Sequence, residues 1–441
     1  MNVVCIGSGY VGSITAASFA KWGHRTTIVD VDQRKIDLIN AGKSPIYEPG
    51  LDTLIAQLVK DGLGKLTATT SYSSVSEANV VIIAVGTPSL KDGTADLKYV
   101  KSAAASIGTN LNPNRFTVIV NKSTVPVGTT DMVASIIEDA SELKADENFA
   151  VVSNPEFLRE GYALEDVFGP DRIVVGSNHK RARRVMRQMY SELLKHAPKV
   201  KYVETDVKSA ELIKYASNAF LAVKISYINE MARLCESLGA NVLEIAKGMG
   251  LDSRIGDKFL QVSSGWSGSC FPKDTKELLA TSRKYGCDLS IVEASVTSNE
   301  RMHRYCVEKI QRQLKTLNGK TIGILGLTFK PNTDDARETQ AQYVIRTLLR
   351  MDSKVNAHDP KGMEMFQMMN EGLAVQYCLQ AEEIAKRADA LILLTHWEEY
   401  RALDWTRIFH AMRTPYILDT RNFLDGNTLR AIGFHYEGIG V

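Results

Sequence analysis

The chain of 441 residues is long enough for two or three domains with ample hydrophobic cores. Its 53 lysines and arginines against 51 aspartates and glutamates leave a net charge of +2, which argues against nucleic acid or an anionic membrane as a partner. The six cysteines are scattered and no cluster of metal ligands is present, so we expect neither disulfides nor a metal. No apolar run has the length of a membrane span, and no basic segment precedes the first apolar run, so we expect a cytoplasmic protein without a signal peptide.

The N-terminal segment predicts a dinucleotide site. An apolar strand over residues 3–6 is followed by Gly7-Ser-Gly-Tyr-Val-Gly12 and then by a helical pattern. Gly7 allows the tight turn, Gly9 lets the main chain approach a pyrophosphate, and Gly12 lets helix and strand pack closely. Asp30 ends the second predicted strand, where a carboxylate binds ribose hydroxyls and repels a 2′-phosphate. The sequence therefore predicts NAD rather than NADP as the cofactor.

Short apolar runs alternate with helical patterns, which is typical of a doubly wound parallel sheet. The predicted strands of the first half cover residues 3–6, 26–29, 80–85, 117–120, 150–152 and 173–175. The pattern restarts after Lys320, with strands over residues 321–327, 354–359, 388–394 and 415–419. We therefore expect an α/β protein with two Rossmann-like lobes joined by a long central helix. Gly323 and Gly326 do not complete a second fingerprint, so we expect a single NAD site.

Residues 207–238 contain neither proline nor glycine, which predicts one long helix of about 30 residues. Lys214 and Asn218 are four residues apart and therefore share one face of it. Apolar residues occupy most of the other faces, which indicates burial between the lobes or against another subunit. A lysine on such a helix is costly unless it is paired or functional, the alternative being that Lys214 reaches solvent.

The segment Gly-Trp-Ser-Gly-Ser-Cys-Phe-Pro-Lys-Asp, residues 265–274, carries the candidate nucleophile. Cys270 stands just before Pro272 and a pattern typical of a helix start. The positive end of the helix dipole and the nearby Lys273 both favour the thiolate. A nucleophilic thiol with a nicotinamide site predicts an oxidation that passes through a carbon–sulfur adduct. The alternative is that Cys270 is a small buried hydrophobe.

Basic residues follow the predicted strands of the second lobe. Ligands bind at the carboxyl ends of parallel strands, which places Lys330, Arg337 and Arg421 on loops suited to phosphate. The alternative for each of the three is a solvated surface charge.

Seven motifs, in order and spread over nearly the whole chain, resemble the UDP-glucose/GDP-mannose dehydrogenase family. They are Gly7-Ser-Gly-Tyr-Val-Gly12, Val85-Gly-Thr-Pro88, Lys122-Ser-Thr-Val-Pro-Val127, Asn154-Pro-Glu-Phe-Leu-Arg-Glu-Gly161, Glu211-Leu-Ile-Lys-Tyr-Ala-Ser-Asn218, Gly268-Ser-Cys-Phe-Pro-Lys-Asp274 and Phe329-Lys-Pro-Asn-Thr-Asp-Asp335. Within the family, Cys-Phe-Pro-Lys-Asp and the stretch 254–259 resemble the branch that acts on UDP-glucose.

The resemblance implies an NAD-dependent four-electron oxidation of the C6 hydroxyl of UDP-glucose to UDP-glucuronate. Cys270 would capture the aldehyde as a thiohemiacetal, which the second oxidation converts to a thioester. Lys214 and Asn218 would stabilise the developing oxyanion. Asp274, assisted by Thr124, would orient water or carry protons.

The family pattern also implies the hydrolytic base and two sets of binding residues. Glu156 would be the general base of thioester hydrolysis. The cofactor set is Gly7, Gly9, Val11, Gly12, Asp30, Lys35, Thr87, Thr124, Glu160, Lys273 and Arg337. The substrate set is Glu156, Phe157, Leu158, Arg159, Glu160, Lys214, Asn218, Arg254, Phe259, Leu260, Ser267, Lys330 and Arg421.

A domain plan follows from the same resemblance. We expect an NAD-binding domain over residues 1–200, a central helical dimerisation region with the reactive cysteine over 201–300, and a UDP-sugar-binding domain over 318–441. Arg254 would reach the sugar of a neighbouring subunit, which implies a functional homodimer through the central helix.

The turn before the cysteine departs from the family pattern Gly-Phe-Gly-Gly-Ser-Cys. Trp266 stands for phenylalanine and Ser267 for a glycine, at a place where the family's main chain approaches the substrate. UDP-glucose remains the expected substrate, with an N-acetylated or galacto UDP-hexose as the alternative. A non-catalytic NAD-binding regulator would need neither Cys270 nor Lys214, and a two-electron hydroxyacid dehydrogenase would need no second lobe.

Overall fold

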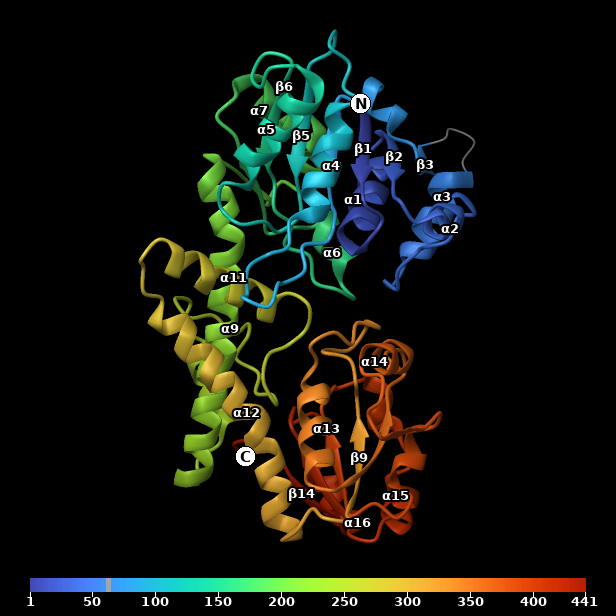
Figure 1. The fold of residues 1–441 in the computed structure, drawn as a ribbon. Helices are drawn as coiled ribbons and strands as arrows, with labels where there is room; N and C mark the ends of the chain where they lie inside the picture. Colours follow the sequence, from blue (N-terminus) through green and yellow to red (C-terminus); the bar gives the residue numbers. More distant parts are fainter. Residues whose placement is uncertain (61–64) are drawn as a thin grey trace. The chain divides into compact units, whose positions relative to one another are not determined.

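The computed structural model describes residues 1–60 and 65–441, which fall into two compact units (Figure 1). The first comprises Met1–Ser217 and Lys276–Thr281, and the second comprises Asn218–Thr275 and Ser282–Val441. The borders fall within two continuous helices, α9 (Val207–Leu238) and α11 (Phe271–Lys284). Each unit is built on one β-sheet, so the two predicted α/β lobes are confirmed.

The first unit contains an eight-stranded sheet with the order β3-β2-β1-β4-β5-β6-β7-β8. Neighbouring strands are parallel, except that β6 and β7 pair antiparallel. The strands are β1 (Asn2–Ile6), β2 (Arg25–Val29), β3 (Leu66–Thr69), β4 (Val80–Ile83), β5 (Thr117–Asn121), β6 (Phe149–Ser153), β7 (Arg172–Gly176) and β8 (Lys201–Thr205). The helices are α1 (Tyr10–Lys21), α2 (Gln33–Asn40), α3 (Leu51–Lys60), η1 (Tyr72–Glu77), α4 (Lys98–Gly108), α5 (Thr129–Ser141), α6 (Ala163–Phe168), α7 (Lys180–Met189) and α8 (Ser191–His196).

Both faces of this sheet are covered, which explains why its central strands are continuous apolar runs. Val3 and Cys5 of β1 pack in one buried cluster with residues of α1. Val4 and Ile6, on the opposite face, pack in a second cluster with residues of α4 and α5. Strands buried on both faces have no polar alternation, and the sequence predicts them for that reason.

The second unit contains a six-stranded parallel sheet with the order β11-β10-β9-β12-β13-β14. Its strands are β9 (Thr321–Leu325), β10 (Lys354–His358), β11 (Val375–Tyr377), β12 (Ala390–Leu393), β13 (Tyr416–Asp419) and β14 (His435–Glu437). Its remaining helices are α10 (Val242–Gly250), α12 (Ser290–Leu314), α13 (Gln340–Arg350), α14 (Met363–Met369), η2 (Ala381–Ala385), η3 (Glu398–Ala402), α15 (Trp405–Ala411) and α16 (Gly426–Ile432).

Four strands, which lie at the edges of the two sheets, were not predicted from the sequence: β3, β8, β11 and β14. They are three to five residues long and partly exposed. An edge strand has one neighbour and a weaker demand for apolar residues, so it leaves no continuous apolar run in the sequence.

The loop after β9 resembles the nucleotide loop after β1. The acidic residue that follows the next strand, Asp359, forms hydrogen bonds with groups of the protein itself. Asp359, which follows β10, is fully buried. Its carboxylate accepts hydrogen bonds from the main-chain N–H groups of Leu327 and Thr328, at 2.7 and 3.0 Å, and from the indole of Trp397, at 3.0 Å. Because Asp359 is fully buried, whereas Asp30 after β2 is partly exposed, Asp359 cannot reach the ribose of a second dinucleotide.

Helix α9 spans 32 residues, about 48 Å at 1.5 Å per residue, so the predicted single helix is confirmed. Four large apolar side chains on it, Phe220, Tyr227, Leu234 and Leu238, are 47–71% exposed. Their spacing of seven, seven and four residues places them on one face. Across the residues that the structure describes, no helix is both long and apolar enough to cross a membrane.

Candidate active site

The glycines after β1 form a cradle that fits a dinucleotide. Gly7 has φ +102°, and a Cβ there would lie 2.6 Å from the carbonyl oxygen of Ala84. A Cβ on Gly12 would lie 2.0 Å from the carbonyl oxygen of Gly7. Nothing lies within 4 Å of the corresponding point at Gly9. Packing therefore requires glycine at positions 7 and 12, whereas Gly9 leaves open space for a pyrophosphate.

Asp30 follows β2 and holds this cradle. Its carboxylate accepts two hydrogen bonds from Ser8, one from the main-chain N–H and one from the hydroxyl, both at 2.6 Å, and a third from the Asp32 N–H at 2.9 Å. Partial burial raises the pKa of Asp30, but the bonds from Ser8 and Asp32 outweigh it and hold the pKa below its usual value. A charged carboxylate at the end of β2 fits NAD and disfavours a 2′-phosphate.

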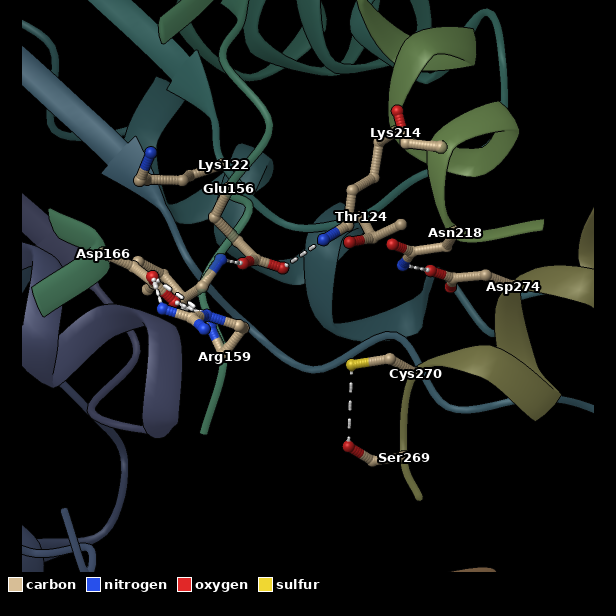
Figure 2. A network of polar contacts seen from close by, with 12 residues as sticks. Lys122, Thr124, Glu156, Arg159, Asp166, Lys214, Asn218, Ser269, Cys270 and Asp274 are labelled. Carbon is tan, nitrogen blue, oxygen red and sulfur yellow. Dashed lines mark hydrogen bonds and ion pairs between the residues drawn. The ribbon is translucent and has the colours of Figure 1, made fainter. Parts of the chain in front are cut away.

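Glu156 and Lys214 form a buried ion pair in the first unit (Figure 2). Their side chains are 8% and 5% exposed, and Lys214 Nζ donates to Glu156 Oε1 at 2.8 Å. The other carboxylate oxygen accepts the Leu158 N–H at 2.6 Å. Burial raises the pKa of Glu156, but the attraction of Lys214 and these hydrogen bonds more than offset it and lower the pKa below the usual value. Glu156 is therefore an ionised acceptor, and Lys214 does not reach solvent.

Lys122 is a second buried lysine in this unit, to which the sequence analysis assigned no role. It follows β5, is 8% exposed, and its Nζ lies 3.3 and 3.5 Å from the side-chain and main-chain oxygens of Asn154. Burial lowers the pKa of Lys122 to about 8. The available signal was a lysine two residues after the apolar run 118–120, because burying a lysine without need is costly.

Glu48, also missed, connects the nucleotide cradle to the segment that carries Glu156. It is 5% exposed, and its carboxylate accepts the N–H groups of Gly161 and Ala163, both at 2.6 Å. The same carboxylate accepts the hydroxyl of Tyr10, which lies within the glycine fingerprint. Because these partners are 38 to 115 residues away in sequence, no local pattern could have indicated them.

Cys270 is exposed and stands directly before α11 in the second unit, as predicted. Its carbonyl accepts the N–H of Asp274 at 2.8 Å, which closes the first helical turn. Its Sγ lies 3.8 Å from the hydroxyl of Ser269 (Figure 2). The thiol is thus at the positive end of a helix, where the dipole favours a thiolate.

Asp274 is the buried partner of two predicted site residues. It is 1% exposed and accepts the side-chain amide of Asn218 at 2.6 Å (Figure 2). It also accepts the ammonium of Lys273 at 2.5 Å. Lys273 is therefore directed to the carboxylate of Asp274, a contact that sequence proximity to Cys270 did not reveal. Asn218, Lys273 and Asp274 form one hydrogen-bonded group beside the start of α11.

The predicted cofactor residues divide between the units. Besides the three glycines and Asp30, five of them lie in the first unit. Val11 is on α1 and Lys35 on α2. The Thr87 hydroxyl donates to the carbonyl of Thr124 at 2.8 Å, and Glu160 is buried. Lys273 and Arg337 lie in the second unit, where the Arg337 guanidinium binds both carboxylate oxygens of Asp335, at 2.8 and 2.7 Å.

The segment after Glu156 is held by its own ion pairs and ring contacts. The Phe157 ring lies under the guanidinium of Arg172, 3.9 Å from its centroid. The Arg159 guanidinium binds both oxygens of Asp166, at 2.6 to 3.0 Å. The main-chain N–H groups of Leu158 and Arg159 donate to Glu156 and Asp166, at 2.6 and 2.7 Å, so the main chain at these two residues is held within the first unit.

The remaining predicted substrate residues lie in the second unit. Arg421 follows β13, its Nε donates to the carbonyl of Leu394 at 2.8 Å, and burial lowers its pKa to about 10. The Arg254 side chain is 87% exposed and pairs with Asp252.

Leu260 packs into the hydrophobic core, which leaves only its main chain to contact a ligand. The others are Phe259, which has φ +66°, Ser267, which is buried, and Lys330, whose ammonium lies 5.4 Å from the Phe329 ring centroid.

Within the described residues, no group of three or more histidine, cysteine, aspartate or glutamate side chains is arranged to hold a metal ion.

Three family profiles match the chain in order: the NAD binding domain of the UDP-glucose/GDP-mannose dehydrogenase family over residues 1–194, its central domain over 208–301 and its UDP binding domain over 323–426. The chain is 45% identical to a UDP-glucose 6-dehydrogenase of Rhizobium meliloti (strain 1021), covering 100% of this chain and 99% of that protein. It is 42% identical to the UDP-glucose 6-dehydrogenase TuaD of Bacillus subtilis (strain 168), covering 100% and 93%.

Solved structures show the same likeness. A UDP-glucose dehydrogenase from Pyrobaculum islandicum is similar with a TM-score of 0.90 and 37% identity, covering 100% of this chain and 97% of that one. A UDP-D-ManNAc dehydrogenase from Pyrococcus horikoshii is similar with a TM-score of 0.86 and 26% identity, covering 100% and 99%.

Proposed function

The chain belongs to the UDP-glucose/GDP-mannose dehydrogenase family, and on that premise we propose that it oxidises UDP-glucose to UDP-glucuronate with NAD. The observation that carries the proposal is the exposed Cys270 at the start of α11, beside the bonded pair Asp274 and Asn218. Another UDP-hexose is the second candidate, because a UDP-D-ManNAc dehydrogenase shares the fold over its full length.

Cys270 divides the four-electron oxidation into two hydride transfers joined by a covalent intermediate. NAD, which the glycines of the cradle and Asp30 would hold, would supply the hydride acceptor for both oxidations. In the first oxidation the C6 hydroxyl also loses its proton to water. Between them, the Cys270 thiolate adds to the aldehyde carbon, so that a carbon–sulfur bond forms and the carbonyl oxygen becomes an alkoxide. After the second oxidation, water adds to the thioester carbon, the carbon–sulfur bond breaks, and the thiolate leaves as the carboxylate forms.

In this scheme Lys214 supplies the positive charge that stabilises the oxyanion, and Glu156 supplies the general base. The Lys214 ammonium stabilises the oxyanion that develops at C6, as a donor held in place before the reaction. Glu156 is ionised and can accept a proton from the water that attacks the thioester. Asn218 would support the oxyanion together with Lys214, and Asp274, assisted by Thr124, would orient the water or carry protons.

The stoichiometry of the reaction tests the function. We expect two NADH per UDP-glucose and a uronic acid as the product, because a thioester intermediate requires two oxidations. The measurement is NADH absorbance against product quantified by mass spectrometry, over a panel of UDP-glucose, UDP-galactose and N-acetylated UDP-hexoses. One NADH per sugar, with an aldehyde or ketone as the final product, would contradict the thioester route.

Asp30→Ala is expected to weaken NAD without affecting the sugar. Loss of charged hydrogen bonds to the ribose costs about 1.5–3 kcal/mol, or roughly a 10- to 150-fold rise in the KM for NAD. The KM for UDP-glucose should stay within about twofold, and the preference for NAD over NADP should shrink. Steady-state kinetics with both cofactors measures this, and equal wild-type efficiency with NAD and NADP would refute the role of Asp30.

We further propose that the enzyme is a homodimer through α9. The exposed apolar face formed by Phe220, Tyr227, Leu234 and Leu238 supports this, because exposed apolar patches of this kind mark protein–protein interfaces. The family profile for the central domain covers the same helix. In a dimer, the exposed Arg254 would serve the sugar site of the partner.

Leu234→Glu is expected to convert the dimer to monomers, because a charge at the centre of an apolar interface is left without a partner. Leu379→Glu is the matched control, since Leu379 is 81% exposed on the edge of the second sheet. Analytical ultracentrifugation measures the outcome. A dimer that persists in Leu234→Glu, or dissociates equally in Leu379→Glu, would count against the α9 interface.

We also propose that three functional regions share the two compact units: NAD binding in residues 1–200, dimerisation and the nucleophile in 201–300, and UDP-sugar binding in 318–441. The three family profiles support this division, because they end and begin near the same positions.

A further inference from the structure

The segment that leads to Cys270 is held by buried amide side chains of the second unit. Asn229 on α9 accepts the main-chain N–H of Ser263 at 2.9 Å. Gln340 on α13 donates its side-chain amide to the carbonyl of Gly265 at 2.6 Å. Both amides are 2% exposed, so these bonds do not compete with solvent. The main chain is therefore fixed five to seven residues before the nucleophile.

Trp266 is bound from both its main chain and its ring. Asn299 on α12 accepts the Trp266 N–H at 2.7 Å and donates to the Trp266 carbonyl at 2.8 Å. The indole N–H donates to the hydroxyl of Ser226 on α9 at 2.9 Å. That hydroxyl lies 2.9 Å from the hydroxyl and 3.0 Å from the carbonyl of Ser295 on α12. Trp266 is 5% exposed, and its three hydrogen bonds connect the segment to two long helices.

Close packing removes the freedom that two glycines would otherwise give this segment. A Cβ on Gly265, which has φ +121°, would lie 2.6 Å from Asn299 Oδ1 and 2.7 Å from His303 Nε2. A Cβ on Gly268, which has φ +85°, would lie 2.7 Å from the ring of Phe329. The main chain on both sides of Trp266 is therefore in contact with its surroundings and has little room to shift.

We propose that Trp266, through the bond from its indole to Ser226, is a positioning residue that fixes Cys270 for attack on the aldehyde. The inference rests on the proposed function. Trp266 is four residues before the nucleophile, and the indole bond ties that point of the chain to α9. Displacements well below 1 Å at a nucleophile reduce the fraction of complexes in attack geometry, so a directional bond at this place acts on the rate.

Two single variants and their combination isolate the indole bond. Trp266→Phe keeps an aromatic ring and removes the N–H, and the Ser226 hydroxyl retains Ser295 as a partner. Ser226→Ala removes the acceptor and leaves the indole in place. Each single variant should lower kcat by about three- to tenfold, the factor that corresponds to one net hydrogen bond. The double variant should lose no more than the larger single variant, because both changes break the same bond.

Three readouts separate positioning from a structural or electronic role. The KM for NAD and for UDP-glucose should stay within about twofold. The rate of Cys270 alkylation by iodoacetamide, and the pH midpoint of that rate, should remain at wild-type values, since a small reagent needs no fixed attack geometry. Trp405→Phe, at a tryptophan 8% exposed elsewhere in the second unit, is the control and should leave kcat unchanged.

Wild-type kcat in both single variants, additive losses in the double variant, or a shifted alkylation midpoint would each overturn the positioning role. If Trp266→Phe does not fold, Ser226→Ala decides the question alone. A wild-type enzyme that fails to oxidise UDP-glucose overturns the proposed function and this inference with it. An active wild-type enzyme with unaffected variants overturns the inference alone.

Discussion

Cys270→Ser is expected to abolish formation of the acid, with kcat at least about a thousandfold below wild type. An unactivated serine hydroxyl is a far weaker nucleophile than a thiolate near neutral pH, and no thioester can form without the sulfur. NAD binding should survive, because Cys270 is not one of the predicted cofactor residues and the cradle of Gly7, Gly9 and Gly12 is unchanged by the substitution. Product quantification by mass spectrometry and a fluorescence titration with NADH measure the two outcomes.

Cys287→Ser is the matched control for this variant. Cys287 is a second exposed cysteine, 17 residues further along the chain and just after α11. Its replacement should leave turnover at the wild-type rate. Acid formation near the wild-type rate by Cys270→Ser would show that the central assignment of the nucleophile is wrong.

Glu156→Gln is expected to stall the reaction after the second oxidation. An amide cannot accept the proton of the attacking water, and loss of a general base lowers a rate by about 10²- to 10⁴-fold. The acyl group should then remain on Cys270 and be visible as a mass increase in intact-protein mass spectrometry after mixing with UDP-glucose and NAD. The first turnover should still release NADH as a burst.

The pH dependence of the wild-type enzyme provides an independent check on Glu156. Lys214 and the Leu158 N–H lower the pKa of this carboxylate, so the basic form persists as the pH falls below the usual glutamate range and is lost only when the pH passes the lowered pKa. The hydrolytic step should therefore not titrate near pH 4.5, the usual value. Single-turnover hydrolysis of the acyl-enzyme, followed by rapid quench, measures it.

Replacing Glu156 also leaves Lys214 buried without its carboxylate, which costs about 3–5 kcal/mol of stability. Thermal unfolding must therefore confirm that the variant is folded at the assay temperature. Glu165→Gln, at an exposed glutamate on α6, is the matched control. Wild-type turnover by folded Glu156→Gln, with no adduct on Cys270, would exclude Glu156 as the hydrolytic base.

Features of this protein that depend on local pattern could be predicted from its amino-acid sequence. The glycine spacing of the nucleotide cradle depends on a local contact, because a Cβ on Gly12 would lie 2.0 Å from the carbonyl oxygen of Gly7, five residues earlier. The central helix follows from 32 residues without a helix breaker. The central strands β1 and β4 are almost entirely apolar because both faces of the first sheet are covered. Cys270 was recognisable because a helix start follows it directly in the chain.

The pairing of polar side chains depends instead on how distant segments pack in the folded chain. Lys214 meets Glu156 across 58 residues, and Asn218 meets Asp274 across 56. Helical spacing showed that Lys214 and Asn218 share a face, but it could not name their partners, because a partner depends on which distant segment packs there. The same holds for the bond from Trp266 to Ser226, 40 residues apart. Periodicity in a sequence records which face is buried, whereas the geometry of a polar contact depends on the packing of elements that are remote in the chain.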